Sequence, residues 1–188
     1  PTLAITADSP SAITYGNAVP TLTATVTGQQ NGDTLGQIFI TQATVTAGGA
    51  TATSGNLVAG NHTLTAAGAV EDLGYALSYS TGTLAINALA LTGTGIAAAS
   101  GTYGTPFANG AVTFGNVIVG DLVSASATTV SPTFSSSGNL SAGNYKQNTD
   151  GTLAGTDAAN YTLTGGFPTA THNYSVGTLA LTGTGIAA

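Results

Sequence analysis

The chain of 188 residues contains no cysteine, methionine or tryptophan. Disulfides are therefore excluded, and two isolated histidines without any cysteine do not make a zinc site. One lysine stands against seven acidic residues, so the formal net charge is −6. A single cation cannot neutralise a phosphate backbone, and we therefore expect no nucleic-acid partner.

The sequence also lacks the segments that would target it to a membrane. It begins without Met and without the basic region of a signal peptide, so we expect a mature fragment or a slice of a longer protein. No apolar run approaches the roughly 18 residues of a membrane helix, and we expect no membrane insertion. With one basic residue the chain offers one site to trypsin, which suits a protein outside the cell.

What the sequence does contain is an internal duplication. Residues 89–98, LALTGTGIAA, recur without change at 179–188. Other segments recur in the same order: Tyr15-Gly16 as Tyr103-Gly104, Gly32-Asp33 as Gly120-Asp121, and residues 54–61 as 137–144. The offsets drift as they do when loops change length and strands do not, so we predict two homologous modules, 1–87 and 88–188.

Within each module the pattern has the period of a β-strand. Residues 21–27 (TLTATVT) alternate apolar and hydroxyl side chains, and Tyr75, Leu77 and Tyr79 share one face. Turn signals such as 31–33 (NGD) follow about every 8–12 residues, and no capped helical pattern appears. We predict an all-β fold of two tandem small antiparallel β-sandwiches, immunoglobulin-like in size but without the immunoglobulin cysteines.

Several short motifs resemble a known family. Module one carries Tyr15-Gly16, 20–23 (PTLT) and 31–35 (NGDTL), and module two carries 120–123 (GDLV), 141–145 (SAGNY) and 157–163 (DAANYTL). Module one resembles the mostly-beta, glycine-rich repeats of large bacterial adhesins. Module two resembles the related repeat named for a Tyr-Asp-Gly start, which here is Tyr103-Gly104-Thr105. The resemblance implies tandem arrays in secreted, surface-attached filamentous-haemagglutinin-like proteins, where the repeats form a stalk and not a catalyst.

Four aspartates are weak candidates for a calcium site. Asp33 and Asp121 follow Gly in equivalent turns, and Asp72 and Asp157 precede the equivalent tyrosines of the two modules. Calcium requires several carboxylate and carbonyl oxygens to converge. The alternative is that Asp33 and Asp121 cap their turns through bonds to the backbone. We expect no other metal or cofactor.

Catalysis is not expected. Glu71 and Asp72 are adjacent, so on a strand their side chains point to opposite faces and cannot act as a pair. His62 and His172 lie in different contexts, and we expect each at the surface. No nucleophile elbow, metalloprotease motif or phosphate loop is present. We therefore predict that the protein is not an enzyme.

Surface binding is the alternative class of function. A carbohydrate-binding module would present aromatic rings in a groove, for which the candidates are Tyr15, Tyr103, Tyr145 and Phe167. Thr-x-Thr pairs could form an ice-binding ladder, but their spacing is irregular and Thr favours strands in any case. Potential glycosylation triplets begin at Asn61, Asn139, Asn160 and Asn173.

The repeated segment 179–188 allows two interpretations. It closes the sheet of its own module, or it adds to the sheet of a neighbouring chain through Leu179, Leu181 and Ile186 and so builds a filament by strand complementation. We predict a structural spacer of an extracellular bacterial adhesin, with neighbouring repeats or copies of itself as partners. A self-assembling filament subunit and a carbohydrate- or ice-binding module, with surface glycans as partners, remain the alternatives.

Overall fold

The computed structural model describes residues 1–105 and 108–183 and separates the chain into two compact units. Unit 1 consists of Pro1–Leu89 together with Ala159–Tyr161, and unit 2 consists of Ala90–Ala158 with Thr162–Ala188. By its contacts, the short segment Ala159–Tyr161 belongs to unit 1, although its sequence lies in the second repeat. Within the described residues, no helix has the length and apolarity to cross a bilayer.

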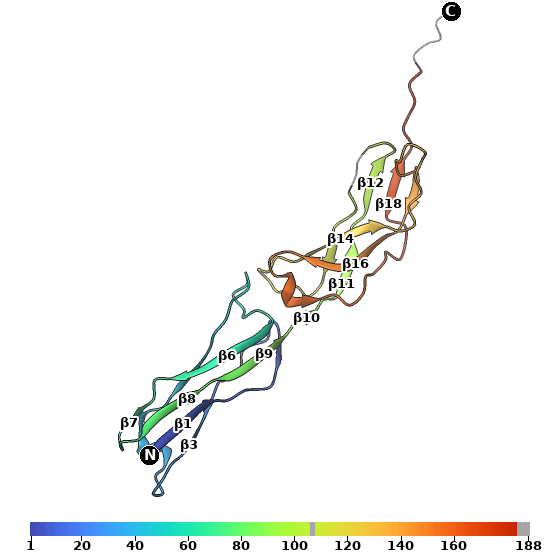
Figure 1. Ribbon diagram of the computed structural model, residues 1–188. Coiled ribbons are helices and arrows are strands. Elements are labelled where there is room, and N and C mark those ends of the chain that lie inside the picture. The colour runs from blue at the N-terminus through green and yellow to red at the C-terminus, as the bar shows by residue number, and fades with distance from the viewer. Residues whose placement is uncertain (106–107, 184–188) are drawn as a thin grey trace, which may run out of the picture. The chain divides into compact units, whose positions relative to one another are not determined.

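Unit 1 is built from two main sheets (Figure 1). The first has the order β3-β1-β8, with strands β1 (Thr2–Ala7), β3 (Ala24–Thr27) and β8 (Ala76–Ser80). The second has the order β2-β9-β6-β5, with strands β2 (Ile13–Thr14), β5 (Thr44–Ala47), β6 (Gly60–Ala67) and β9 (Gly82–Asn87). A small third sheet pairs β4 (Phe39–Thr41) with β7 (Val70–Glu71).

The core of unit 1 follows from strict alternation along three strands. Every second residue is buried, and these residues are Leu3, Ile5 and Ala7 on β1, His62, Leu64 and Ala66 on β6, and Gly82, Leu84 and Ile86 on β9. Because β1 contacts both β6 and β9, the buried faces of the two sheets lie against each other. The intervening Thr and Ala residues face outward, as a period of two requires.

The sheets of unit 2 have only two or three strands each. They pair β11 (Gly93–Ile96) with β13 (Val112–Phe114), and β14 (Ser124–Thr129) with β16 (Gln147–Ala154). A three-stranded sheet has the order β12 (Ala99–Thr102), β18 (Tyr174–Gly177), β15 (Gly143–Tyr145). The short strands β10 (Leu89–Ala90) and β17 (Tyr161–Thr162), whose residues are divided between the two units, form a further pair, and the 3-10 turn η1 (Ala158–Asn160) precedes β17. Tyr145, Tyr174 and Val176 form the buried cluster of the three-stranded sheet.

The structure confirms the all-β class, but the strand pairing is mixed and not wholly antiparallel. Parallel pairs join β1 to β8, β2 to β9, and β12 to β18. Parallel pairing is sterically possible here because most of a unit separates the two strands of each pair along the chain, so no tight hairpin is needed. Alternation in sequence fixes which face of a strand is buried, but it does not report the direction of the neighbouring strand.

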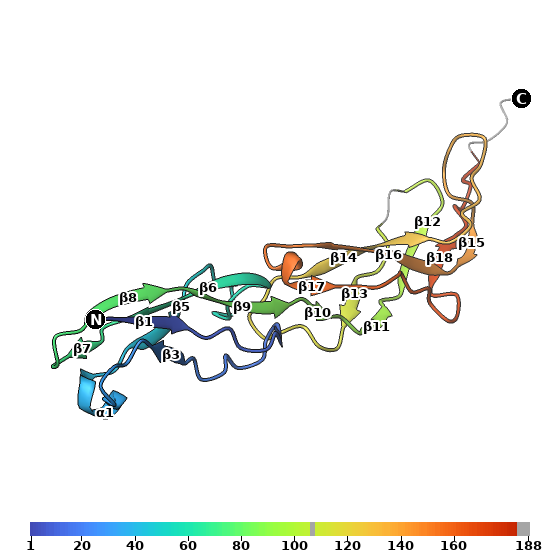
Figure 2. The same ribbon diagram turned by 60° about the horizontal axis from the view of Figure 1, so that its bottom comes forward.

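One helical turn was not expected from the sequence. α1 (Leu35–Ile38) is drawn in light blue in Figure 2. Its signal is a capping box, since the Thr34 backbone N–H donates to Gln37 Oε1 at 2.9 Å. The turn buries Ile38 against Leu3 and Tyr75 and so closes one end of the core. A helix of four residues is too short to show a 3.6-residue period.

The interior of unit 2 contains a fully buried amide. Gln147 has no exposed surface. Its Oε1 accepts from the Gly110 N–H at 2.6 Å, and its Nε2 donates to Ala97 O at 2.9 Å and to Asn173 Oδ1 at 3.0 Å. All its polar atoms are satisfied, so this polar core residue ties three separate segments together.

We expect Gln147→Ala to lower the free energy of unfolding of unit 2 by about 3 kcal/mol, because the Gly110 N–H and the Ala97 carbonyl lose their buried partner. Urea unfolding followed by NMR at amides of unit 2 measures this change. The control is Gln42→Ala, which alters an exposed glutamine of unit 1 and should change stability by less than about 0.5 kcal/mol. Equal midpoints for Gln147→Ala and the parent chain would contradict the role of the buried amide.

Candidate functional site

The two repeats share one loop, bond for bond. Residues 50–58 of unit 1 correspond to 133–141 of unit 2 at the offset of 83 found in the sequence. The equivalent backbone bonds are Ala52 N–H to Asn56 O (2.8 Å) and Ser135 N–H to Asn139 O (2.9 Å), Gly55 N–H to Ala52 O and Gly138 N–H to Ser135 O (both 2.9 Å), and Val58 N–H to Ala50 O (3.2 Å) and Ser141 N–H to Thr133 O (2.9 Å). The duplication is therefore present in the structure as well as in the sequence.

A tyrosine fixes this loop to the last strand of each unit. The Tyr15 N–H donates to Asn87 O at 2.8 Å, and its hydroxyl lies 3.2 Å from Ser54 Oγ. In unit 2 the Tyr103 N–H donates to Gly177 O at 2.8 Å, and its hydroxyl lies 3.4 Å from Ser137 Oγ. We name these places site 1 (Tyr15, Ser54, Asn56, Ala59) and site 2 (Tyr103, Ser137, Asn139, Ala142).

Site 1 is filled by a turn that belongs to the same unit. The ring of Tyr161 meets the ring of Tyr15 edge to face, with centroids 5.3 Å apart and planes at 75°. The preceding side chain, Asn160, accepts a hydrogen bond from the Ala59 N–H at its Oδ1, at 2.8 Å. Tyr15, Asn160 and Tyr161 are all buried. One ring and one amide oxygen thus complete this end of unit 1.

Site 2 is open. Tyr103 is only half-buried and Ala142 is exposed. The phenol OH lies among hydroxyls, and hydrogen bonds from Ser135 and Ser137 lower the pKa of Tyr103. A cavity of about 370 Å³ opens beside the ring, lined by Tyr103, Ser141, Ala142, Thr178, Leu179 and Leu181.

Two of the predicted assembly residues lie at this cavity. Leu179 is 54% exposed and Leu181 is 92% exposed. The segment 178–183 forms no strand, so its described part does not close the sheet of its own unit. Ile186, the third assembly residue, lies outside the described residues.

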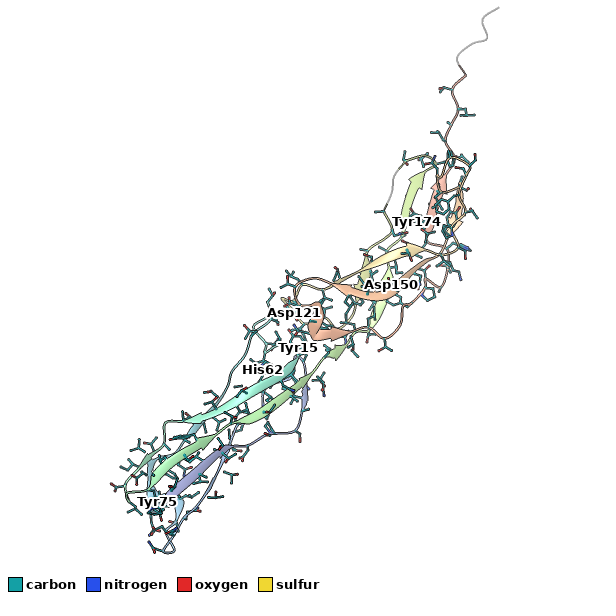
Figure 3. The ribbon with its side chains drawn as sticks, viewed as in Figure 1. Tyr15, His62, Tyr75, Asp121, Asp150 and Tyr174 are labelled. Atoms are coloured by element: carbon teal, nitrogen blue, oxygen red, sulfur yellow. The ribbon has the colours of Figure 1, made fainter. Side chains whose placement is uncertain are left out.

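The expectation that His62 lies at the surface was wrong. His62 is buried, with Nδ1 2.9 Å from Gly48 O and Nε2 2.8 Å from Val58 O (Figure 3). It occupies the place that Tyr145 holds in unit 2, where the Tyr145 hydroxyl donates to the equivalent carbonyl of Ser141 at 2.8 Å. Both rings close the same loop, so His62 is a structural donor. His172 is exposed, as expected.

The four aspartates are divided between the two units, with Asp33 and Asp72 in unit 1 and Asp121 and Asp157 in unit 2. Asp33 Oδ2 accepts from the Tyr75 hydroxyl at 2.7 Å, and Asp72 is exposed. Asp157 is buried and accepts from the Leu122 N–H at 2.8 Å, beside Asp121. Within the described residues, no three His, Asp or Glu side chains gather where they could hold a metal.

The remaining acidic candidate, Glu71, also accepts hydrogen bonds from the backbone. Glu71 Oε2 accepts from the N–H groups of Leu73 and Tyr75, at 2.9 and 3.0 Å, and Asp72 is exposed. The Glu71 carboxylate thus bonds to the backbone of its own turn.

The remaining candidates are separated or occupied. Tyr15 and Tyr145 are buried, so the four aromatic residues do not form one exposed groove. Phe167 is half-buried, and its ring lies directly against Gly93, in the space that a Cβ there would occupy. Of the glycosylation triplets, Asn160 is buried, and Asn173 donates through Nδ2 to Ile96 O at 2.8 Å. Asn61 is exposed and Asn139 is half-buried.

Sequence reasoning missed the role of Asn160 at site 1. In the sequence this residue stands out only as the start of a glycosylation triplet and as part of the 157–163 motif. The signal that could have found it is its position, because Asn160 stands immediately before the tyrosine that recurs in both repeats. Asn and Gln amides are buried only when partnered, so an Asn beside a buried ring indicates a specific acceptor.

The bond between Tyr75 and Asp33 predicts a loss of stability at alkaline pH. The Asp33 carboxylate accepts from the neutral phenol, which raises the pKa of Tyr75 above its ordinary value of 10.0. A raised folded-state pKa contributes stability that is present below pH 10.0 and is lost as the pH rises through the folded pKa. We expect Tyr75→Phe to be less stable than the parent near neutral pH and to lose less stability above pH 10.0.

Denaturant unfolding of unit 1 as a function of pH measures the effect. Tyr79→Phe is the matched control, because Tyr79 lies on the same segment and is 42% exposed. If Tyr75→Phe and Tyr79→Phe follow the same alkaline profile, Asp33 does not hold the phenol.

The filling of site 1 predicts the behaviour of one amide. In Asn160→Ala the Ala59 N–H loses its acceptor, so its hydrogen exchange should become about tenfold faster, while strand β6 stays protected. NMR exchange at Ala59 measures this. Asn61→Ala, which removes an exposed amide close to Ala59 in the sequence, is the control and should leave the Ala59 rate unchanged. A protected Ala59 in Asn160→Ala would contradict the assignment.

The comparison with known families bears on this repeated architecture. No curated protein and no solved structure matches the chain. Tyr15-Gly16-Asn17 in unit 1 has its counterpart in Tyr103-Gly104-Thr105 of unit 2. Residues 3–85, which include the first of these triplets, match the family model of the MBG domain (YGX type), a repeat domain found in bacterial surface proteins.

Proposed function

We propose that this chain is a structural spacer, a pair of stalk repeats in an extracellular bacterial adhesin of the filamentous-haemagglutinin-like kind, with no catalytic role. The match of residues 3–85 to a repeat domain of bacterial surface proteins supports the location. The buried or backbone-bonded state of His62, Glu71 and Asp157 supports the absence of catalysis, since these groups already serve the fold.

The observation that carries the proposal is a parallel strand pair repeated in both units. In unit 1, β2 pairs parallel with β9 through Ile13–Ile86 and Thr14–Asn87. In unit 2, β12 pairs parallel with β18 over four residue pairs, from Ala99–Tyr174 to Thr102–Gly177. Each pair joins an early strand of its unit to the last one, and β12 and β18 lie side by side in Figure 1.

This pairing suits a chain under tension. When the chain is pulled from its two ends, the early strand is drawn backwards and the last strand forwards along the same axis. In a parallel pair this motion shears the whole row of hydrogen bonds at once, whereas an antiparallel hairpin pulled from its open end opens one bond at a time. A module that transmits force needs the first arrangement.

A self-assembling filament subunit is the second candidate, because Leu179 and Leu181 are exposed at the cavity of site 2. Strand complementation through this segment would cover both side chains. A carbohydrate-binding module has less support, since two of its four candidate rings are buried. The ice-binding alternative also has less support. The hydroxyls of Thr23 and Thr25 donate to the Asp8 carboxylate at 2.6 and 2.7 Å, so their hydrogens are already used within unit 1.

Force spectroscopy on the full chain tests the spacer. The Ala99 N–H donates to Asn173 O at 3.0 Å, and β12 is an edge strand. Ala99→Pro removes this bond, and we expect unit 2 to unfold about tenfold faster at the same force.

Ser100→Pro is the matched control. In a parallel ladder alternate residues face the neighbouring strand, so the Ser100 N–H points away from β18 and its loss should leave the forced unfolding rate near that of the parent. If Ala99→Pro and the parent chain unfold at the same rate under force, the parallel pair carries no load and the spacer proposal fails.

A further inference from the structure

We propose that site 2 is a docking surface for the Asn-Tyr-Thr turn of a further module of the same kind. The inference rests on the proposed spacer function and names the partner that one end of unit 2 receives. The occupant is defined by its chemistry: a tyrosine ring that packs edge to face on Tyr103, and a preceding side-chain amide whose oxygen accepts from the Ala142 N–H.

The first argument is the filled counterpart. Site 1 has the same tyrosine, serine, asparagine and alanine as site 2, at matching positions of a loop that repeats bond for bond. There, Asn160 and Tyr161 supply the amide oxygen and the ring. Unit 2 presents the same receiving groups with a cavity of about 370 Å³ in place of the turn. Two equivalent surfaces, one covered and one open, indicate what the open one receives.

The second argument comes from the identical segments 89–98 and 179–188. In the first copy Leu91 is 8% exposed, and its N–H donates to Thr162 O at 2.7 Å. In the second copy the same leucine, Leu181, is 92% exposed. Sequence cannot explain this difference, because it is the same in both copies. In the first copy the Asn-Tyr-Thr turn lies beside the leucine, as the bond from Leu91 to Thr162 shows.

The third argument decides between a further module and a second copy of this chain. Asn160 and Tyr161 are 3% and 4% exposed, so in a second copy they are already used. The other equivalent turn is Gly74-Tyr75, which has a tyrosine but no side-chain amide, and the Tyr75 hydroxyl is held by Asp33. The chain has two other Asn-Tyr pairs, 144–145 and 173–174, and their tyrosines are also buried. A second copy thus lacks an exposed Asn-Tyr pair, whereas a further module whose Asn-Tyr-Thr turn is uncovered has one.

The chain itself provides the experiment. We would extend the chain by adding a second copy of residues 99–178 directly after Ala188. Because 179–188 is identical to 89–98, the extended chain then ends in a complete further copy of 89–178. We expect exchange of the Ala142 amide, measured by NMR, to become about tenfold slower in this extended chain than in the 188-residue chain. In a matched extended chain whose added counterpart of Asn160 is alanine, this slowing should disappear.

Each outcome decides the proposal. The Ala59 amide is the internal reference and should exchange at one rate in all chains, since site 1 is unchanged. An Ala142 rate that does not slow in the extended chain overturns the proposal. So does failure of the added copy to fold, because the same sequence folds in unit 2. Slowing in the 188-residue chain as its concentration rises would assign site 2 to a second copy instead. Forced unfolding of Ala99→Pro is measured on the 188-residue chain, which carries no added copy, so the spacer proposal and this one can fail separately.

Discussion

A tyrosine that bonds at both its backbone and its hydroxyl is the contact on which each unit depends. Tyr15 and Tyr103 bond by their N–H to the residue at the end of the last strand, and by their hydroxyls to a serine of the repeated loop. The ring between these two bonds is held in place, so the strand pair, the loop and the open or filled site are positioned by one residue. A phenol is suited to this, because its body packs as an apolar plate while its tip still makes a hydrogen bond.

The two units share the tyrosine bonds and the repeated loop, but their core side chains differ. At equivalent positions, unit 1 has His62 and Leu64 where unit 2 has Tyr145 and Gln147. His62 and Tyr145 both bond to the same carbonyl of the loop, so the exchange preserves a bond and changes the ring. Leu64 and Gln147 are both fully buried, but Gln147 exchanges apolar packing for three side-chain hydrogen bonds. The backbone tolerates this because every buried polar atom of the side chain finds a partner.

Much of the fold could be predicted from the sequence, and what could not has physical reasons. Alternation along β1, β6 and β9 is a local signal, so the all-β class and the buried faces follow from it. Parallel pairing between β2 and β9 joins residues far apart in the chain, which no local pattern reports. His62 was expected at the surface because a lone histidine carries no sign of the two carbonyls that surround it. Likewise, the motif that contains Asn160 was visible, but its contact with Ala59 spans 101 positions of sequence.

The segment Ala159–Tyr161 also sets an order in time. A chain made or exported from its N-terminus presents Tyr15 and Ala59 long before Asn160 and Tyr161 emerge. Until then the sheets of unit 1 can form, but the end of the unit stays uncovered, and its completion waits for residues from the second repeat. Unit 1 is therefore finished late although it is made first. The last contacts of unit 1 can form only after the chain has been made or exported at least as far as residue 161.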